Sequence, residues 1–321
     1  MGERFDVTYK VCSTALKLFG AHPSSSLSAK WLILTFMSYI VNICVFISLI
    51  YSSFYESFTK VCANMALAVV FVIISFDHAI LIMHKEKFSD LIEFTEYDLE
   101  RSEAFCPEDK MIVLKYNKRS KKASKIWYVA SIITLASFLI EPLGYTIYSA
   151  VIGHFEPMPI FEVTYPDYIE KITNRIDIYL VIYILQSYYV WFSCVVYTGF
   201  YSLGIILILH TCGQIELVIR HLGQLFVKEH IDVTVTQKSI RGIALHIQNI
   251  YRFVDQIQYT HKTSYEICLK TAAISIPITC FGVIESQENG SISIELIIHV
   301  FGFLGQCYIP CYYCDLLLRK V

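Results

Sequence analysis

The side chains that could do chemistry in this sequence are tyrosines, a few ionisable groups inside apolar runs, and scattered cysteines. Tyr145 and Tyr148 are three residues apart, and Tyr179 and Tyr183 are four apart, so each pair would share one face of a helix. Aromatic rings that carry hydroxyl groups suit the recognition of a small, mostly apolar molecule. Packing or lipid contact explains any single tyrosine better, but as a group they indicate a ligand pocket.

Ionisable side chains inside a membrane are costly, and each one suggests a function. Glu141 lies beside a proline, and two explanations fit it equally well: a hydrated cavity at a helix kink, or a carboxylate that reaches the outer interface. Glu295 and His299 are four residues apart and share a helix face close to the outer surface. Asp77 and His78 lie near the inner end of an apolar run, so we expect their side chains to snorkel to the membrane surface.

The sequence contains no catalytic constellation: GxSxG, HExxH and a Gly-rich phosphate loop are all absent. Cys307, Cys311 and Cys314 have a spacing that a metal could use on one helix, but no matching pair lies elsewhere in the sequence. An apolar helix end is the better interpretation. We therefore predict no enzyme activity, no metal site and no cofactor.

These residues must be positioned by membrane helices. Hydrophobic residues make up 55% of the 321 residues and the mean hydropathy is +0.52. Charged residues make up only 17%, against about 25% in soluble proteins. The net charge of -2 predicts no nucleic-acid partner. The composition indicates an all-α, polytopic helical bundle in a lipid bilayer.

Crossing a bilayer takes about 20 apolar residues in a helix. The runs long and apolar enough are 31–53, 61–83, 126–151, 176–209, 263–284 and 291–313. At about 1.5 Å per residue, the fourth run is longer than a bilayer is thick, so it must tilt or project beyond the membrane.

The distribution of Lys and Arg predicts the orientation. One side of the membrane receives 22 of them and the other side three, which places the N-terminus in the cytoplasm by the positive-inside rule. Trp127 and Tyr128 then lie at the inner edge, where an aromatic belt is expected. A G-protein-coupled receptor has the opposite orientation, and the internal repeats typical of a transporter are absent.

The segment 210–262 carries two apolar stripes at helical spacing, which predict two amphipathic helices on the cytoplasmic side. Such helices must bury their stripes against a packed layer or a partner subunit. The stripes are Ile215, Val218, Ile219, Leu222, Leu225 and Phe226, and then Ile243, Ile247, Ile250, Val254 and Ile257.

Several stretches resemble the insect odorant receptor family in order and position. They are HTCGQIELVIRHLGQL (210–225), HIQNIYRFVDQIQYTHKTSYEICL (246–269), GFLGQCYIPCYYCDLL (302–317), FDHAILIMHKEKFSDLIEF (76–94) and YPDY (165–168). Each motif is loose, but their order and spacing together are specific. The inside N-terminus, derived independently from charge, is an unusual feature of that family.

The resemblance implies a seven-helix subunit of an odorant-gated, non-selective cation channel. Such a subunit would assemble with a shared odorant co-receptor in the plasma membrane of sensory neuron dendrites and bind a small volatile apolar ligand. Residues in regions that match the family's pocket are Tyr145, Tyr148, Tyr179, Tyr183 and His299.

The resemblance also implies a division of the chain. Residues 1–30 would form a cytoplasmic arm, 31–209 the first four membrane helices around the ligand, 210–262 the cytoplasmic amphipathic helices that anchor subunits together, and 263–321 the fifth and sixth membrane helices.

The closing stretch departs from the family pattern. Cys314 stands where the family usually has glycine, and a linker with a seventh, pore-lining helix is expected after it. On this basis we expect the printed sequence to end one helix early. The alternatives are a non-conducting membrane protein that binds ligand or modulates a co-receptor, and a gustatory receptor of the same superfamily.

Overall fold

The computed structural model describes residues 3–18, 20–22, 24–25, 29–161, 172, 175–227, 233–288 and 294–320. Throughout these ranges every regular element is a helix, which confirms the predicted all-α class. The YPDY motif lies outside them. The elements are α1 (Glu3–Thr8), α2 (Lys10–Leu18), α3 (Ala29–Tyr55), α4 (Phe58–Met83), α5 (Lys85–Arg101), η1 (Ser102–Ala104), α6 (Pro107–Ile152), α8 (Ile176–Val227), α9 (Val233–Glu288) and α10 (Ile294–Leu318).

Six of these helices are long and apolar enough to cross a membrane: α3, α4, α6, α8, α9 and α10. This confirms the six predicted spans. Helices α6, α8 and α9 have 46, 52 and 56 residues. At about 1.5 Å per residue each exceeds the hydrocarbon thickness of about 30 Å, so a single helix continues from the membrane into the solvent region.

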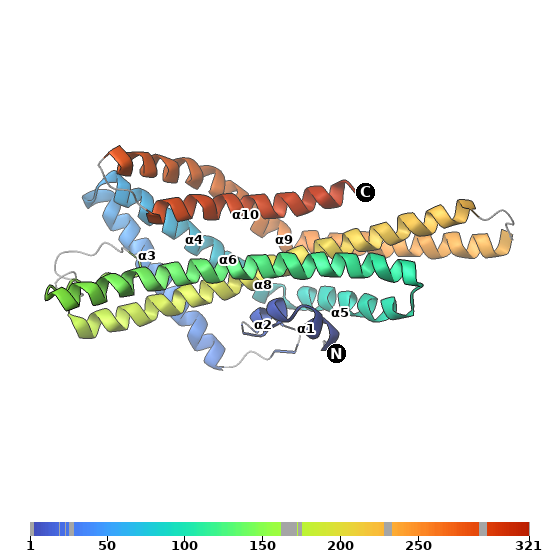
Figure 1. Cartoon of the computed structure of the whole chain (residues 1–321), viewed down its shortest axis with the longest axis horizontal. Helices are drawn as coiled ribbons and strands as arrows, with labels where there is room; N and C mark the ends of the chain where they lie inside the picture. The colour runs from blue at the N-terminus through green and yellow to red at the C-terminus, as the bar shows by residue number, and fades with distance from the viewer. Residues whose placement is uncertain are drawn as a thin grey trace.

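Helices α6 and α8 lie side by side along the long axis of the molecule (Figure 1). Pro107 occupies the first turn of α6, where its missing N–H is harmless. At the other end Gly153 adopts a left-handed conformation, with φ +90°. The N–H of Gly153 bonds to the carbonyl of Ala150 at 3.2 Å, and the N–H of His154 to that of Ser149 at 3.1 Å. This glycine-based cap ends α6 and turns the chain back.

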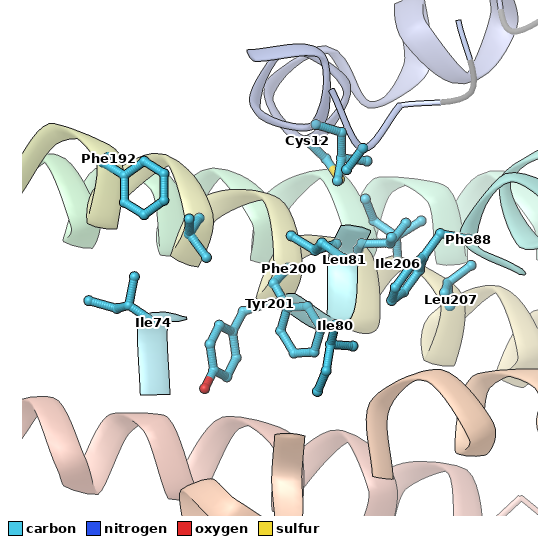
Figure 2. Close-up of a cluster of buried hydrophobic side chains, with 14 of the residues drawn as sticks. Cys12, Ile74, Ile80, Leu81, Phe88, Phe192, Phe200, Tyr201, Ile206 and Leu207 are labelled. Carbon is cyan, nitrogen blue, oxygen red and sulfur yellow. The ribbon is translucent and has the colours of Figure 1, made fainter. Parts of the chain in front are cut away.

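Helix α8 is the centre of the bundle. In its most apolar window 83% of residues are buried, against 6% for α6. Figure 2 shows Phe200, Ile206 and Leu207 of α8 among side chains from α2, α4 and α5. A helix surrounded by other helices needs apolar residues on all sides along its buried length. This explains why the fourth apolar run is so long.

Of the two N-terminal helices, α2 packs against the middle of α8, and α1 packs against α2 and α5. The Cys12 thiol donates to the carbonyl of Gly199 at 3.7 Å, and Cys12 is fully buried. A Cβ added at Gly199 would already be 3.5 Å from Ala15 and 3.6 Å from Leu16. These are ordinary van der Waals distances, so α2 packs directly on α8 at Gly199, and a methyl group would still fit there.

One expectation about side chains was wrong. Asp77 and His78 do not reach the membrane surface, because their side chains are 0% and 2% exposed. Asp77 accepts a hydrogen bond from Ser264 of α9 instead. The position of Trp127 in an aromatic belt stays a prediction; in the structure its indole N–H donates to the carbonyl of Tyr197 at 3.1 Å.

The two amphipathic stretches are helical, as the stripes predicted, but as continuations of the spanning helices α8 and α9 rather than as separate elements. Together they extend as a two-helix arm on the right of Figure 1. Ile243 and Ile257 are buried, whereas Ile219 and Leu222 are 52% and 37% exposed. Only part of the apolar surface of the arm is covered within this chain.

Candidate ligand-binding cavity

A cavity of about 470 Å³ lies between α4, α6, α8 and α10, with Phe161 of the α6–α8 connection completing its wall. Its volume falls within the range of about 300–1,000 Å³ that is typical of small-molecule sites. The lining residues are Leu67, Val70, Phe71, Ile74, Trp127, Ala130, Ser131, Thr134, Leu135, Phe138, Phe161, Val190, Ser193, Cys194, Tyr197, Ile297, Ile298, His299, Phe301, Gly302, Phe303, Gly305 and Gln306.

Among the described residues, the lining carries no Asp, Glu, Lys or Arg. The hydroxyls of Ser131, Thr134 and Ser193 each donate to a carbonyl of their own helix, at 3.0, 3.1 and 2.8 Å. They can still accept a hydrogen bond from a ligand. Because the described part of the wall carries no Asp, Glu, Lys or Arg to pair with a charged ligand, the cavity suits a neutral, largely apolar molecule.

Polar groups gather at one end of the cavity. The Gln306 side-chain amide donates to the hydroxyl of Tyr197 at 2.6 Å and, more weakly, to that of Tyr201 at 3.4 Å. The Trp127 indole N–H is fixed by the Tyr197 carbonyl. These bonds tie α6, α8 and α10 together and hold an amide group where a ligand could reach it.

Aromatic rings form the opposite wall. Phe161 packs against Phe71 and Phe138, with ring centroids 5.1 and 6.2 Å apart. The side-chain oxygen of Gln186 accepts the backbone N–H groups of Ile160 at 2.9 Å and Phe161 at 3.4 Å. This buried glutamine therefore positions the connecting segment so that Phe161 completes the wall.

Of the predicted site residues, only His299 lines the cavity. It is 6% exposed, and its ring centroid lies 6.1 Å from that of Phe138. The sequence had singled out His299 as an ionisable group on a membrane helix, and the family resemblance placed it in the region of the pocket.

The four predicted tyrosines lie toward the ends of α6 and α8, outside the cavity lining. Tyr179 is buried, and its hydroxyl contacts that of Thr146 at 3.0 Å and donates to the carbonyl of Met158 at 3.1 Å. Tyr183 donates to the carbonyl of Leu139 at 2.9 Å. Tyr145 and Tyr148 are 46% and 65% exposed. Direct ligand contact by these tyrosines stays a prediction.

Sequence reasoning missed Trp127, Ser193, Tyr197 and Gln306 as lining residues. Gln306 could have been predicted from the sequence, because a side-chain amide inside an apolar run is costly in a membrane and therefore suggests a function. The other three residues carry no such signal, because helix packing decides which face of α8 meets α6 and α10.

Comparisons with known proteins identify the family. A sequence model of the 7tm odorant receptor family matches residues 57–320. The chain belongs to the odorant receptor family. Its members are receptors rather than enzymes, in agreement with the missing catalytic motifs. The match indicates the odorant receptor family rather than the alternative of a gustatory receptor.

Solved structures support the fold of this odorant receptor. The chain is similar to the insect olfactory receptor OR5 from Machilis hrabei, with 16% identity and a TM-score of 0.67 over 98% of this chain and 80% of that one. It is also similar to the same receptor in complex with eugenol, with 15% identity and a TM-score of 0.72 over 98% of this chain and 78% of that one. Among curated proteins the search found no match. The odorant receptor described here is thus a multi-pass membrane protein with an olfactory receptor fold.

Proposed function

We propose that this odorant receptor is the ligand-binding subunit of an odorant-gated, non-selective cation channel. It would assemble with an odorant co-receptor in the plasma membrane of sensory neuron dendrites. The observation that carries the proposal is the uncharged, aromatic-lined cavity of about 470 Å³ between α4, α6, α8 and α10.

The cavity supports a definite class of ligand. A neutral, volatile molecule with an apolar or aromatic body would fill the space among the phenylalanines, and one hydroxyl or carbonyl group could reach Gln306 or His299. Eugenol, which is bound in one of the similar OR5 structures, is a reasonable probe of this class. His299 is the proposed contact that the cavity includes, and Tyr145, Tyr148, Tyr179 and Tyr183 remain predicted contacts.

The proposed orientation has the N-terminus in the cytoplasm, supported by the 22 Lys and Arg on one side against three on the other. An epitope tag at the N-terminus should stain only after the cells are permeabilised. Staining of intact cells would contradict this orientation.

The experiment co-expresses the chain with an odorant co-receptor and records currents evoked by a panel of neutral volatiles that includes eugenol. The test variant is Ser193→Phe, which places a ring in the cavity from α8. The matched control is Ile184→Phe on the same helix, because Ile184 is 64% exposed and lies outside the cavity.

We expect a volatile from the panel to evoke a current that the co-receptor alone does not give. Ser193→Phe should lower the sensitivity by about tenfold or more, which corresponds to about 1.4 kcal/mol of binding free energy. Ile184→Phe should respond as the unmodified chain does. Equal responses from all three proteins would contradict the cavity assignment, and a reduced co-receptor current on co-expression would favour the modulatory alternative.

A further inference from the structure

A carboxylate is buried where the spanning helices α4 and α9 meet. Asp77 of α4 is 0% exposed. Its Oδ1 accepts a hydrogen bond from the Ser264 hydroxyl of α9, and its Oδ2 has no hydrogen-bond partner among the described residues. Ser264 itself is 2% exposed. The ligand cavity does not include either residue.

No positive charge compensates this carboxyl group within the described part of the chain, where Asp77 takes part in no ion pair. The neighbouring His78 has its ring beside those of Tyr39 and Phe192, at 6.4 and 5.1 Å. The titratable groups that face Asp77 are Tyr197 and Tyr201 from α8 and Tyr265 and Cys268 from α9, with Cys307 of α10 beside Cys268. All of these side chains are neutral at pH 7 in their ordinary state.

The surroundings are otherwise apolar. Ile73, Ile74, Ile80 and Leu81, one turn away from Asp77 on α4, are each at most 5% exposed. An isolated ionised carboxylate in such a medium costs far more free energy than a neutral carboxyl group, so a buried acid without a counter-ion takes up a proton. One serine hydroxyl is too small a compensation for a full charge.

A bound metal cation is the other way to neutralise the charge, but the geometry does not favour it. Hard cations such as Ca²⁺ and Mg²⁺ gather six or more oxygen ligands. Here one carboxyl group and one hydroxyl converge, and the described residues contain no group of three or more His, Cys, Asp or Glu side chains that could hold a metal ion.

We propose that Asp77 is a proton-binding site, and that the neutral carboxyl group with Ser264 forms a hydrogen-bonded clasp between α4 and α9. The proton is held at neutral pH in the folded receptor. An unfolded aspartate is ionised at that pH, so folding takes up one proton at this site. The folding equilibrium constant therefore falls about tenfold for each unit by which the pH rises, until the folded site loses its proton.

The clasp connects to the polar end of the ligand cavity through few contacts. Ser264 lies one helical turn before Cys268, whose sulfur accepts the Tyr201 hydroxyl at 3.8 Å. Tyr201 in turn accepts the Gln306 amide at 3.4 Å, and Gln306 lines the cavity. The proton site is thus placed to influence α9, the helix that continues into the arm.

The first test is an infrared spectrum of the purified receptor in lipid nanodiscs at pH 7, for the unmodified chain and for Asp77→Asn. Asparagine has the shape of a protonated aspartate and still bonds to Ser264, so the variant should fold. We expect the carbonyl band of a protonated carboxylic acid in the unmodified receptor, with its shift in D₂O, and loss of that band in Asp77→Asn. If the two spectra agree in this region, the proposal is wrong.

The second test follows the thermal unfolding midpoint of both proteins from pH 6 to pH 9. The midpoint of the unmodified chain should fall more steeply with rising pH than that of Asp77→Asn, because only the former loses a bound proton. Equal slopes would contradict the proposal. A second result would also contradict it. If added Na⁺ at constant ionic strength raised the unfolding midpoint of the unmodified chain but not that of Asp77→Asn, Asp77 would be a cation site instead. Neither test depends on odorant binding or on current, so failure here would leave the proposed function intact.

Discussion

Tyr179 has a structural role, whatever its part in ligand recognition. Its hydroxyl joins Thr146 of α6 to the carbonyl of Met158 in the connecting segment. Replacing it with phenylalanine leaves the Met158 carbonyl without this donor, whereas Thr146 still accepts the Met158 N–H at 3.0 Å. We expect Tyr179→Phe to lower the free energy of unfolding by about 1 kcal/mol. Thermal or chemical unfolding of the purified protein measures this.

The same variant tests the ligand contact predicted from the sequence. Tyr179 lies outside the cavity lining, so ligand binding confined to the cavity would leave the concentration dependence of the odorant response of Tyr179→Phe unchanged. Tyr148→Phe is a matched control for stability alone, since Tyr148 is 65% exposed on α6 and its loss of a hydroxyl should not affect stability. A clear loss of sensitivity in Tyr179→Phe at unchanged surface expression would support direct contact instead.

At the scale of elements, Gly204 allows α8 and α9 to pack closely. A Cβ at this position would collide with the Tyr265 hydroxyl and lie 3.2 Å from Nε2 of His261. Both neighbours are held in the ring-packed core, with centroids 5.6 Å apart. We expect Gly204→Ala to destabilise the receptor by about 1–3 kcal/mol through overpacking. The free energy of unfolding provides the measurement.

Tyr265→Phe supplies the control for this packing. Removing the hydroxyl opens the space that the new methyl group needs, so the double variant should be more stable than the sum of the two single effects implies. Gly223→Ala on the same helix meets nothing within 4 Å and should stabilise α8 slightly, by about 0.5–1 kcal/mol. Additive effects of Gly204→Ala and Tyr265→Phe would show that this contact does not limit the approach of the helices.

Glu216 joins three elements outside the predicted membrane spans. Its carboxylate accepts Lys115 and Tyr116 of α6, at 2.8 and 2.6 Å, and Lys320, which follows α10, at 2.9 Å. Partial burial acts to raise the pKa of Glu216, but the hydrogen bonds from Lys115, Tyr116 and Lys320 outweigh it and lower the pKa to about 2. The ionised form is therefore bound more tightly in the folded state than in the unfolded state.

The sign of the pH dependence follows from the lowered pKa. The stabilisation is fully present above the ordinary glutamate value of 4.5 and is lost as the pH falls from there toward about 2. We expect the thermal midpoint of the unmodified chain to drop more between pH 5 and pH 3 than that of Glu216→Gln. Identical acid profiles for the two proteins would show that the cluster adds no stability.

The sequence permitted the six spans to be predicted because a run of about 20 apolar residues has few other uses. It also predicted that 210–262 is helical, from the spacing of the apolar residues. It did not show that these stretches continue α8 and α9 without a break, since the spacing of apolar residues indicates a helix but not where that helix begins or ends. The prediction for Asp77 failed for a related reason. The sequence shows how far along the apolar run Asp77 lies, but not that its side chain points into the bundle, because its partner, the Ser264 hydroxyl, comes from a helix far away in sequence.

The candidate site was less predictable than the fold. Helical spacing shows that Tyr179 and Tyr183 share a face, but not whether that face meets a cavity or a neighbouring backbone. In the structure both hydroxyls bond to backbone carbonyls. The cavity arises where four helices separated along the chain converge, so its lining depends on packing that a single sequence does not encode in any local pattern.

At the scale of the whole molecule, the long helices give the receptor two regions with different surfaces. One holds the cavity among the spanning helices, and the other is the arm formed by the ends of α8 and α9 (Figure 1). Exposed apolar residues such as Ile219 and Leu245, 52% and 53% exposed, suit contact with other subunits. This division is consistent with the proposed function, in which ligand would bind in one region and subunits would assemble through the other.

The central claim is that a small neutral volatile binds in the cavity between α4, α6, α8 and α10. The chain has three tryptophans, and Trp127 lines this cavity. Replacing Trp31 and Trp191 with phenylalanine leaves Trp127 as the sole reporter of ligand contact. We would titrate this variant with the volatile that evokes the largest current and record tryptophan fluorescence. A saturable change over the concentrations that evoke current, abolished by Ser193→Phe, is the predicted result. An active volatile that leaves the Trp127 emission unchanged would contradict the claim.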